Sequence, residues 1–252
     1  PTGYGRIVRD GGEVTRIVEQ RDAGETERAI TEINAGIYVF DAQVLQAGIA
    51  DLSDDNAQGE LYLTDVIGFA RGLGRRVGGS VLTDALQAEG VNDRIQLAAL
   101  STELNRRILR RWMAEGVTVI DPASTWVHDS VDLAPDVTLL PGTSLEGATS
   151  IASGAVIGPD TTLIDVEVDE GAHVVRTHAT LAVIGPNAEV GPFSYLRPGT
   201  QLGVKGKIGA FVETKNATIG DGAKVPHLTY CGDATVGEGA NIGAGTIFAN
   251  YD

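Results

Sequence analysis

The sequence has little of several residue types, and each shortage excludes a class of protein. It contains one cysteine, Cys231, so no disulfide can form within the chain, which fits a reducing cytoplasm. No run approaches the ~18 consecutive apolar residues that a membrane-spanning helix needs. Lys and Arg total 19 against 34 Asp and Glu, a formal net charge of −15. This acidity argues against nucleic acid and anionic membranes as partners, because both bind cationic surfaces.

The sequence also lacks the features of an intact chain end. It has no initiating methionine and no basic-then-apolar signal segment, and it begins at Pro1 within a predicted loop. The last predicted repeat ends at Asp252 with nothing to cap it. We therefore expect an internal fragment of a longer protein that lacks both ends.

What is present divides into three segments. Residues 1–93 combine a strand-like run at 35–40 with a helical run at 41–50, and this pattern of elements is typical of α/β proteins. Residues 94–115 predict a linker helix, with Asp93 as N-cap, Gly116 as stop and a length of ~30 Å. Its expected apolar face consists of Leu97, Leu100, Leu104, Ile108 and Trp112.

Residues 116–252 repeat an aliphatic residue every six positions, often followed by glycine. Neither a helix nor an ordinary strand has this period, which predicts a β-solenoid with three units per coil and residues eighteen apart stacked on one face. A β-sandwich with glycine turns would space its strands irregularly. The register slips around 163–184 and again at 231–236, beside His227, where we expect the reactive face. The positions in register are Leu133, Leu139, Leu145, Ile151, Ile157, Leu163, Ile184, Val190, Leu196, Leu202, Ile208, Ile219, Val225, Cys231, Val236, Ile242 and Phe248.

Two cations share one row of the predicted solenoid. Arg197 and Lys215 are eighteen residues apart, so they should stack in adjacent coils. Two cations so close repel each other unless an anion lies between them. The spacing favours a phosphate-binding pair over two solvated surface cations.

His227 lies two places past an aliphatic position, so the core does not require it. Histidine is a natural general base near neutral pH, and His227 is close in sequence to Lys215 and Tyr230. A plain surface histidine is the alternative. A second alternative is zinc bound between solenoid subunits through His128, His173 and His178, which would need three well-placed ligands.

In the first segment, Gly5 lies in a glycine-rich turn that lets backbone approach a ligand, while Glu19, Asn34 and Asn92 are polar residues beside apolar ones. Spacing alone assigns none of them. In combination, however, the motifs of both halves resemble the bacterial family of bifunctional N-acetylglucosamine-1-phosphate uridyltransferase/glucosamine-1-phosphate N-acetyltransferase enzymes, along all 252 residues. These motifs are Pro1-Thr2-Gly3-Tyr4-Gly5-Arg6, Ile17-Val18-Glu19, Glu32-Ile33-Asn34-Ala35-Gly36, Asn56-Ala57-Gln58-Gly59-Glu60, Tyr62-Leu63-Thr64-Asp65, Gly90-Val91-Asn92, Gly191-Pro192-Phe193, Leu196-Arg197-Pro198-Gly199, Phe211-Val212-Glu213, His227-Leu228-Thr229-Tyr230 and Asn241-Ile242-Gly243-Ala244-Gly245-Thr246.

The resemblance implies the C-terminal part of an α/β nucleotidyltransferase-type domain (1–93), a linker helix (94–115) and a truncated left-handed hexapeptide-repeat parallel β-helix (116–252). It implies two reactions in UDP-N-acetylglucosamine synthesis for peptidoglycan and lipopolysaccharide: acetylation of glucosamine 1-phosphate by acetyl-CoA, then uridylyl transfer from UTP with release of pyrophosphate. It also implies Mg²⁺ at the uridyltransferase site, a homotrimer with acetyltransfer sites between subunits, and a cytoplasmic location.

The resemblance also implies roles for single residues. In the acetyltransferase half, His227 matches the catalytic base, Arg197, Lys215, Tyr230 and Asn241 match the sugar-phosphate ligands, and Ala244, Asn250 and Tyr251 match acetyl-CoA contacts. In the uridyltransferase half, Gly5, Glu19, Asn34 and Asn92 match UDP-sugar contacts, and Asn92 matches a magnesium ligand.

The family's glycine-rich nucleotide loop, a basic residue and a metal-binding aspartate would precede Pro1, and its last coils would follow Asp252. We therefore expect these 252 residues alone to lack uridyltransferase activity and to show weak or no acetyltransfer. Two alternatives stay open: a monofunctional sugar-1-phosphate nucleotidyltransferase whose solenoid regulates or oligomerises, and a structural solenoid scaffold.

Overall fold

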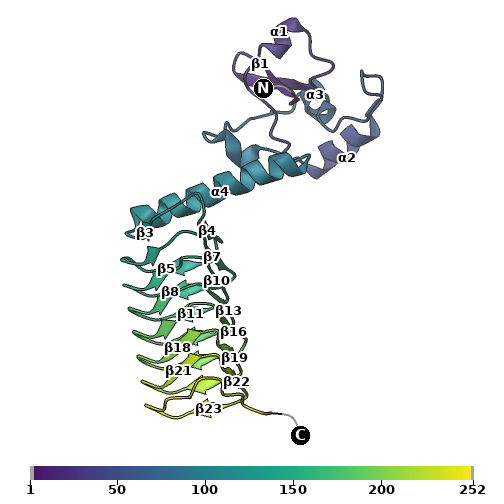
Figure 1. Cartoon of the computed structure of the whole chain (residues 1–252). Coiled ribbons are helices and arrows are strands. Elements are labelled where there is room, and N and C mark those ends of the chain that lie inside the picture. The colour runs from purple at the N-terminus through teal and green to yellow at the C-terminus, as the bar shows by residue number, and fades with distance from the viewer. Residues whose placement is uncertain (1–2, 251–252) are drawn as a thin grey trace. The chain divides into compact units, whose positions relative to one another are not determined.

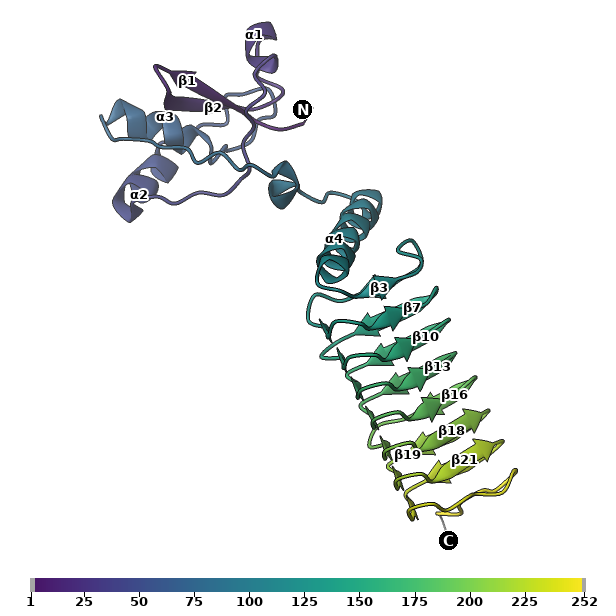
Figure 2. The same cartoon turned by 90° about the vertical axis from the view of Figure 1, so that its left-hand side faces the viewer.

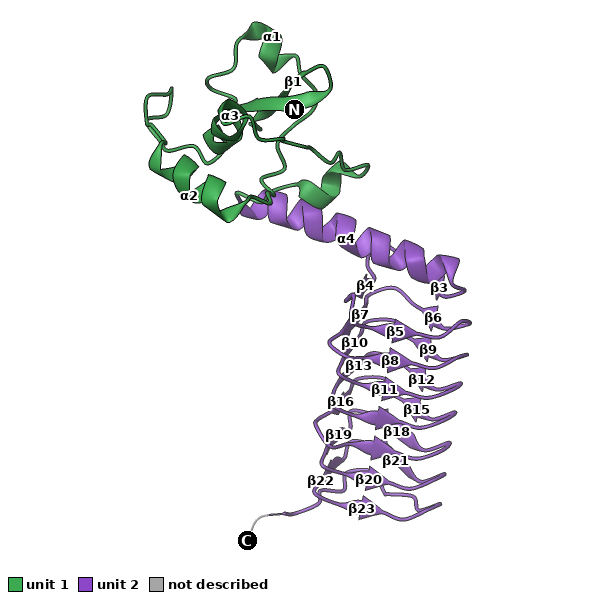
Figure 3. Cartoon of the chain, turned by 180° about the vertical axis from the view of Figure 1, so that it is seen from behind, with its two compact units in different colours: residues 1–92 green, residues 93–252 purple. Residues whose placement is uncertain are grey.

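The chain divides into two compact units in the computed structural model, which describes residues 3–250 (Figure 3). Unit 1 is Pro1–Asn92 and unit 2 is Asp93–Asp252. Within the described range, no helix has the length and apolar character required to cross a membrane. The domain boundaries expected after residues 93 and 115 stay a prediction.

Unit 1 is built on a two-stranded antiparallel hairpin (Figure 1). Its core is small: Val14, Ile17 and Ile67 are buried together. Around the hairpin the chain forms three short α-helices and one 3₁₀ turn. The elements are β1 (Arg6–Asp10), β2 (Glu13–Val18), α1 (Glu25–Arg28), α2 (Ala42–Ala50), α3 (Asp65–Gly72) and η1 (Ala85–Ala88).

One prediction for unit 1 is confirmed and one is wrong. The helix expected over 41–50 is α2, and the carboxylate of Asp41 caps it by accepting from the amides of Gln43 and Val44. The strand expected over 35–40 does not form: this segment has no partner strand among the described residues, and Val39 is 100% exposed. Its residues have β propensity, but a strand also needs a second backbone to satisfy its amide and carbonyl groups.

Unit 2 begins with the long helix α4 (Arg94–Ala114), which has the predicted ends. The side chain of Asp93 accepts a hydrogen bond from the amide of Gln96, and Gly116 follows the helix at φ +99°. Both ends of α4 are therefore set by residues beside them in the sequence, Asp93 at the start and Gly116 after the end.

The buried face of α4 differs from the prediction. Leu97 and Leu104 are more than half exposed, whereas Leu109, which the spacing did not select, is 1% exposed. Asn105 explains the shift, because its side-chain amide donates to the carbonyl of Thr125 (2.8 Å) and accepts from the amide of Val127 (3.0 Å). These two bonds fix which side of the helix meets the first coil, and Ile108, Leu109 and Trp112 enter the core beside them.

After α4 the chain winds into a parallel β-solenoid with three faces of seven strands each, which confirms the predicted repeat (Figure 2). Face 1 contains β4 (Trp126–Val127), β7 (Thr143–Glu146), β10 (Thr161–Ile164), β13 (Thr177–Thr180), β16 (Ser194–Leu196), β19 (Glu213–Lys215) and β22 (Tyr230–Gly232). Face 2 contains β5 (Asp132–Leu133), β8 (Ser150–Ile151), β11 (Glu167–Val168), β14 (Val183–Ile184), β17 (Gln201–Leu202), β20 (Thr218–Ile219) and β23 (Thr235–Val236). Face 3 contains β3 (Thr118–Val119), β6 (Thr138–Leu139), β9 (Val156–Ile157), β12 (His173–Val174), β15 (Glu189–Val190), β18 (Lys207–Ala210) and β21 (Lys224–His227).

The aliphatic ladder forms one continuous core inside the three faces, and Cys231 is fully buried in it, as its place in the repeat predicted. The prediction that residues in adjacent coils are always eighteen positions apart is wrong, however. Ser144 pairs with Thr162 at an offset of eighteen, Thr162 with His178 at sixteen, and Glu213 with Tyr230 at seventeen. The apparent slip at 163–184 is a series of five- and six-residue steps through Val168, Val174 and Ala179, all buried.

Many corners between faces require a left-handed backbone conformation. Asp165, Asn216 and Asp233 follow face 1 strands with φ between +43° and +53°. Asn and Asp tolerate this conformation better than other residues with a side chain. These corners therefore place polar residues directly after face 1 strands, where the candidate site lies.

Candidate functional site

The two cations predicted to share a row do so. Tyr195 pairs with Glu213 and Leu196 with Thr214, so Arg197 and Lys215 continue the same register one residue further along face 1. The amide of Arg197 also donates to the carbonyl of Thr214 (2.8 Å). The stacking that the sequence predicted is therefore present.

The reason given for that stacking needs correction. Each cation already has a carboxylate of the protein beside it: Arg197 Nη1 lies 3.0 Å from Glu213 Oε1, and Lys215 Nζ lies 3.0 Å from Asp233 Oδ2. The hydrogen bond that Arg197 donates to the carboxylate of Glu213 raises the pKa of Arg197. The pKa of Asp233 is lowered by hydrogen bonds from Asn216 and then from Lys215. The row is therefore electrostatically compensated before any ligand binds, and stacking alone does not demand an external anion.

Tyr230 completes this row through a glycine that the sequence reading missed. Lys215 pairs with Gly232, so Gly232 occupies the next place after Arg197 and Lys215. A Cβ at Gly232 would collide with the phenol oxygen and ring of Tyr230. The ring of Tyr230 therefore lies across Gly232, and its hydroxyl extends the row of cations. Counting seventeen residues from Lys215 would have found Gly232, but only the structure shows the ring over it.

His227 lies on the other side of a corner from this row. It ends β21 on face 3, pairs with Ala210 and is exposed, and Leu228 at φ +47° separates it from the start of face 1. Its carbonyl accepts from the hydroxyl of Thr229 (2.7 Å). Within residues 3–250 the imidazole of this exposed residue makes no hydrogen bond to the protein.

The remaining predicted contacts of the acetyltransferase half divide between the two faces. Asn241 forms a parallel bridge with Lys224 on face 3, an offset of seventeen that places Ala244 next to His227. Asn250 lies at the corner after face 1, where its side-chain amide donates to the carbonyl of Gly232 (2.7 Å) and to Asp233 Oδ2 (3.3 Å). Tyr251 lies outside the described residues. The structure thus gathers Arg197, Lys215, Tyr230 and Asn250 beside face 1, and His227, Asn241 and Ala244 on face 3.

Three of the four residues predicted in unit 1 lie together. The carbonyl of Gly5 accepts from the amide of Asn34 (2.9 Å), and a Cβ at Gly5 would lie 3.3 Å from the carboxylate of Glu19. Glu19 in turn accepts from the hydroxyl of Thr64 (3.0 Å), which is buried. Gly5 is therefore packed closely against Ile17 and Glu19, and its predicted contact with a UDP-sugar stays a prediction. Thr64 is a neighbour that sequence spacing gave no sign of.

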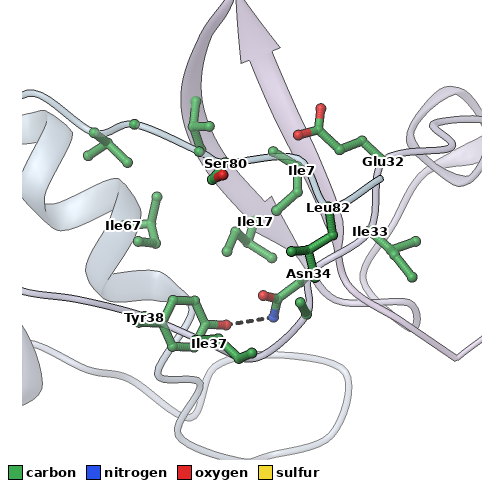
Figure 4. Close-up of a pocket in the computed structure, with 15 residues that line it drawn as sticks. Ile7, Ile17, Glu32, Ile33, Asn34, Ile37, Tyr38, Ile67, Ser80 and Leu82 are labelled. Atoms are coloured by element: carbon green, nitrogen blue, oxygen red, sulfur yellow. Dashed lines mark hydrogen bonds between the residues drawn. The ribbon is translucent and has the colours of Figure 1, made fainter. Parts of the chain in front are cut away.

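Asn34 also lines an apolar cavity of about 280 Å³ (Figure 4). Its side-chain amide donates to the hydroxyl of Tyr38 (2.6 Å), the dashed line in Figure 4, and its oxygen accepts from the amide of Gly36 (3.0 Å). Burial raises the pKa of Tyr38, and the charge of Glu19 acts in the same direction. The Tyr38 phenol is therefore held by Asn34 and lies within reach of the negative charge of Glu19.

Asn92, the fourth, is exposed at the end of unit 1. Among the residues that the structure describes, no group of three or more His, Cys, Asp or Glu is arranged to hold a metal ion. His173 is on face 3, whereas His178 is on face 1 with its ring centroid 5.5 Å from that of Tyr195.

Comparison with known proteins agrees with the motifs. The chain is 59% identical over 252 residues to the "Bifunctional protein GlmU" of Kineococcus radiotolerans, 61% over 252 to that of Pseudarthrobacter chlorophenolicus and 58% over 254 to that of Rhodococcus opacus. Each alignment covers 100% of this chain and 51% of the relative, so the chain spans about half the length of the curated relatives it matches. The resemblance predicted from the motifs is thereby confirmed. No family model matches the chain.

Among solved structures, a mutant of GDP-perosamine N-acetyl transferase from Caulobacter crescentus, in complex with CoA and GDP-perosamine, aligns with a TM-score of 0.34 and 17% identity, over 56% of this chain and 61% of that one. The acetyltransferase domain of PglB from Neisseria gonorrhoeae, in complex with acetyl coenzyme A, aligns with a TM-score of 0.19 and 19% identity, over 66% and 78%.

Proposed function

We propose that the protein containing this chain is a bifunctional enzyme of UDP-N-acetylglucosamine synthesis, because the chain matches relatives named bifunctional protein GlmU along all 252 of its residues. One reaction acetylates the amine of glucosamine 1-phosphate with acetyl-CoA. The other transfers a uridylyl group from UTP to N-acetylglucosamine 1-phosphate and releases pyrophosphate. The observation that carries the proposal is the row of Arg197, Lys215 and the Tyr230 hydroxyl, one corner away from an exposed His227.

For acetyl transfer, Arg197 and Lys215 hold the phosphate of the sugar, which takes its place beside the two cations together with Glu213 and Asp233. Tyr230 and Asn241 contact the sugar, and Ala244, Asn250 and Tyr251 contact acetyl-CoA. The neutral amine attacks the thioester carbonyl, a C–N bond forms and the C–S bond breaks. His227 takes the proton that the amine loses and passes it to the departing CoA sulfur.

A homotrimer would bring the two sets of residues into one site. His227, Asn241 and Ala244 lie on face 3, whereas Arg197, Lys215 and Asn250 lie beside face 1. If face 3 of one copy meets face 1 of the next, three copies close into a ring with three equivalent sites. The division of the predicted residues between faces supports this assembly.

For uridylyl transfer, Gly5 gives close backbone approach, and Glu19 and Asn34 pair with sugar hydroxyl and amide groups. Asn92 supplies a side-chain oxygen to Mg²⁺, which is compatible with an ion that commonly takes one or two protein ligands together with phosphates and water. When bound, Mg²⁺ neutralises charge that develops on the phosphates. We place both reactions in the cytoplasm, where their nucleotide and CoA substrates are found.

Replacing His227 by Ala in the complete gene product tests the proposal. Acetyl transfer, followed as thiol release from acetyl-CoA, should fall by about 10²–10⁴-fold, while uridylyl transfer, followed as pyrophosphate release, stays unchanged. His173→Ala is the matched control, because His173 is an exposed histidine on the same face. Wild-type protein without acetyl transfer would favour a monofunctional nucleotidyltransferase, and wild-type protein without either activity would favour a scaffold.

A further inference from the structure

Asp233 connects three successive coils through its carboxylate. Lys215, eighteen residues earlier, approaches Oδ2 at 3.0 Å, and Asn250, seventeen residues later, donates to the same oxygen at 3.3 Å. Asn216 donates to the other oxygen, Oδ1, at 3.0 Å. The backbone follows the same path, since the amide of Asp233 donates to the carbonyl of Lys215 at 2.8 Å.

Building the corner does not explain this carboxylate. Leu181 and Asn216 occupy equivalent corners after face 1 with φ of +47° and +43°, so the turn accepts other side chains. Asp165 is the equivalent aspartate nearer the start of the solenoid, and it uses its carboxylate on the backbone, accepting from the amide of Ala148 (2.7 Å). The contacts of Asp233 are with the side chains of Lys215, Asn216 and Asn250 instead.

Two of those three side chains belong to opposite substrates in the proposed acetyl transfer. Lys215 is assigned to the phosphate of the acceptor sugar, and Asn250 to the acyl donor. One carboxylate therefore touches both substrate sides, from an exposed corner where 34% of its side chain is accessible.

We infer that Asp233 is a positioning residue that orients Lys215 for the acceptor phosphate and Asn250 for the acyl donor. This inference rests on the proposed acetyl transfer. When the phosphate binds, Lys215 moves only part of the way from Asp233, because the carboxylate keeps its ammonium group within the row. When Asn250 is engaged by the donor, the same carboxylate is held in place for Lys215, so each substrate favours the arrangement that the other needs.

The test compares Asp233→Asn with Asp165→Asn in the complete gene product. Both substitutions keep a residue that tolerates the left-handed corner and remove one negative charge. In Asp233→Asn the KM for glucosamine 1-phosphate should rise about tenfold and the KM for acetyl-CoA about threefold, with kcat within about twofold, because charge-assisted contacts contribute on this scale. Asp165→Asn should change none of the three parameters.

Asn250→Ala provides a second test that leaves the corner intact. A residue that only contacts the donor would raise the KM for acetyl-CoA alone. If Asp233 links Asn250 to Lys215, Asn250→Ala should also raise the KM for glucosamine 1-phosphate, by about threefold. This second effect should vanish when Asn250→Ala is combined with Asp233→Asn. Asp233→Asn could lose thermal stability relative to Asp165→Asn. In that case the effect of Asn250→Ala alone on the KM for glucosamine 1-phosphate, measured with Asp233 in place, decides whether the two residues are coupled.

The outcomes separate this inference from the proposed function. An active wild-type protein with unchanged KM values in Asp233→Asn, or an Asn250→Ala effect confined to acetyl-CoA, overturns the role of Asp233 and leaves acetyl transfer standing. A wild-type protein that does not acetylate glucosamine 1-phosphate overturns both.

Discussion

The two units of this chain obtain their packing in opposite ways. In unit 2 each inner coil supplies the partner strands for the coils on either side, and a single core runs from Ile108 to Val236. In unit 1 the buried cluster is small and joins Val14 and Ile17 of the hairpin to Ile67 of α3, while Ile37 and Val39 are 75% and 100% exposed. A repeat carries its own pairing rule along the sequence, whereas an α/β segment depends on contacts with residues that sequence spacing does not indicate.

The candidate sites differ in the same sense. In unit 2 the candidate site residues lie on the faces and corners of a repeating solenoid, so counting residues from coil to coil predicts which of them share a row. In unit 1 Gly5 lies against Glu19 and accepts a hydrogen bond from the amide of Asn34. Thr64 donates to Glu19, and Asn34 donates to Tyr38. Four pairs of variants, each a substitution with a matched comparison, probe this contrast.

The largest effect on stability is expected in the solenoid core. Leu163 is fully buried, so Leu163→Ala should reduce the free energy of unfolding of unit 2 by about 3 kcal/mol, through lost burial and the cavity left behind. Val39→Ala in unit 1 should change stability by less than about 0.5 kcal/mol, because that side chain is fully exposed. Chemical denaturation of each variant measures both values. Equal losses would show that unit 1 buries Val39 in solution and would remove the contrast.

The next effect concerns the row on face 1. Gly232→Ala places a Cβ where the Tyr230 ring lies, so the phenol must leave the row and the KM for glucosamine 1-phosphate should rise about tenfold, on the scale of a lost hydrogen bond to a charged ligand. Gly237→Ala is the control, since nothing lies within 4 Å of the added carbon. Steady-state kinetics of acetyl transfer give the comparison. An unchanged KM in Gly232→Ala would mean that the position of Tyr230 is unimportant.

A smaller effect is expected at the buried contact in unit 1. Thr64→Val keeps the shape of the side chain but removes the hydroxyl that donates to Glu19, so the KM for N-acetylglucosamine 1-phosphate in uridylyl transfer should rise about fivefold. Thr15→Val removes a hydroxyl bonded to the carbonyl of Val8 and should leave that KM unchanged. Should both variants behave alike, Thr64 has no special relation to Glu19.

The smallest effect is electrostatic and lies on α4. Hydrogen bonds from Arg106 and then Arg107 lower the pKa of Glu103 from 4.5 to about 2. Because the folded-state pKa is depressed, the stabilisation is complete above about pH 4.5 and is lost as the pH falls towards 2. Glu103→Gln should therefore lower the thermal midpoint slightly at neutral pH and not at pH 2, whereas Glu115→Gln serves as the control. A difference that persists unchanged at pH 2 would contradict the ion pairs.

Much of this fold could be predicted from local chemistry. The caps of α2 and α4 follow from Asp41 and Asp93, whose side chains satisfy amides two or three residues ahead. The aliphatic repeat located the inward positions, including the unusual Cys231, and placed Arg197 over Lys215. In each case the information lies within one turn or one coil.

The predictions that were wrong concerned features that depend on residues distant in the sequence. The segment 35–40 has strand propensity but no second backbone, and the buried face of α4 was set by Asn105 bonding to the first coil rather than by leucine spacing. The carboxylates of Glu213 and Asp233 neutralise the two cations, which a count of charges along the chain did not show.

The sequence by itself determined the repeat, the helix ends and the row that holds the two cations, because these follow from short-range periodicity and capping. Only the tertiary structure decided how long each coil is, that Tyr230 lies across Gly232, and that Asp233 joins Lys215 to Asn250. Those features depend on where side chains from successive coils meet. A repeat unit of five residues rather than six shifts the register of every later residue by one. This shift changes which side chains of successive coils come into contact, but it leaves the periodic pattern that predicts the fold unchanged.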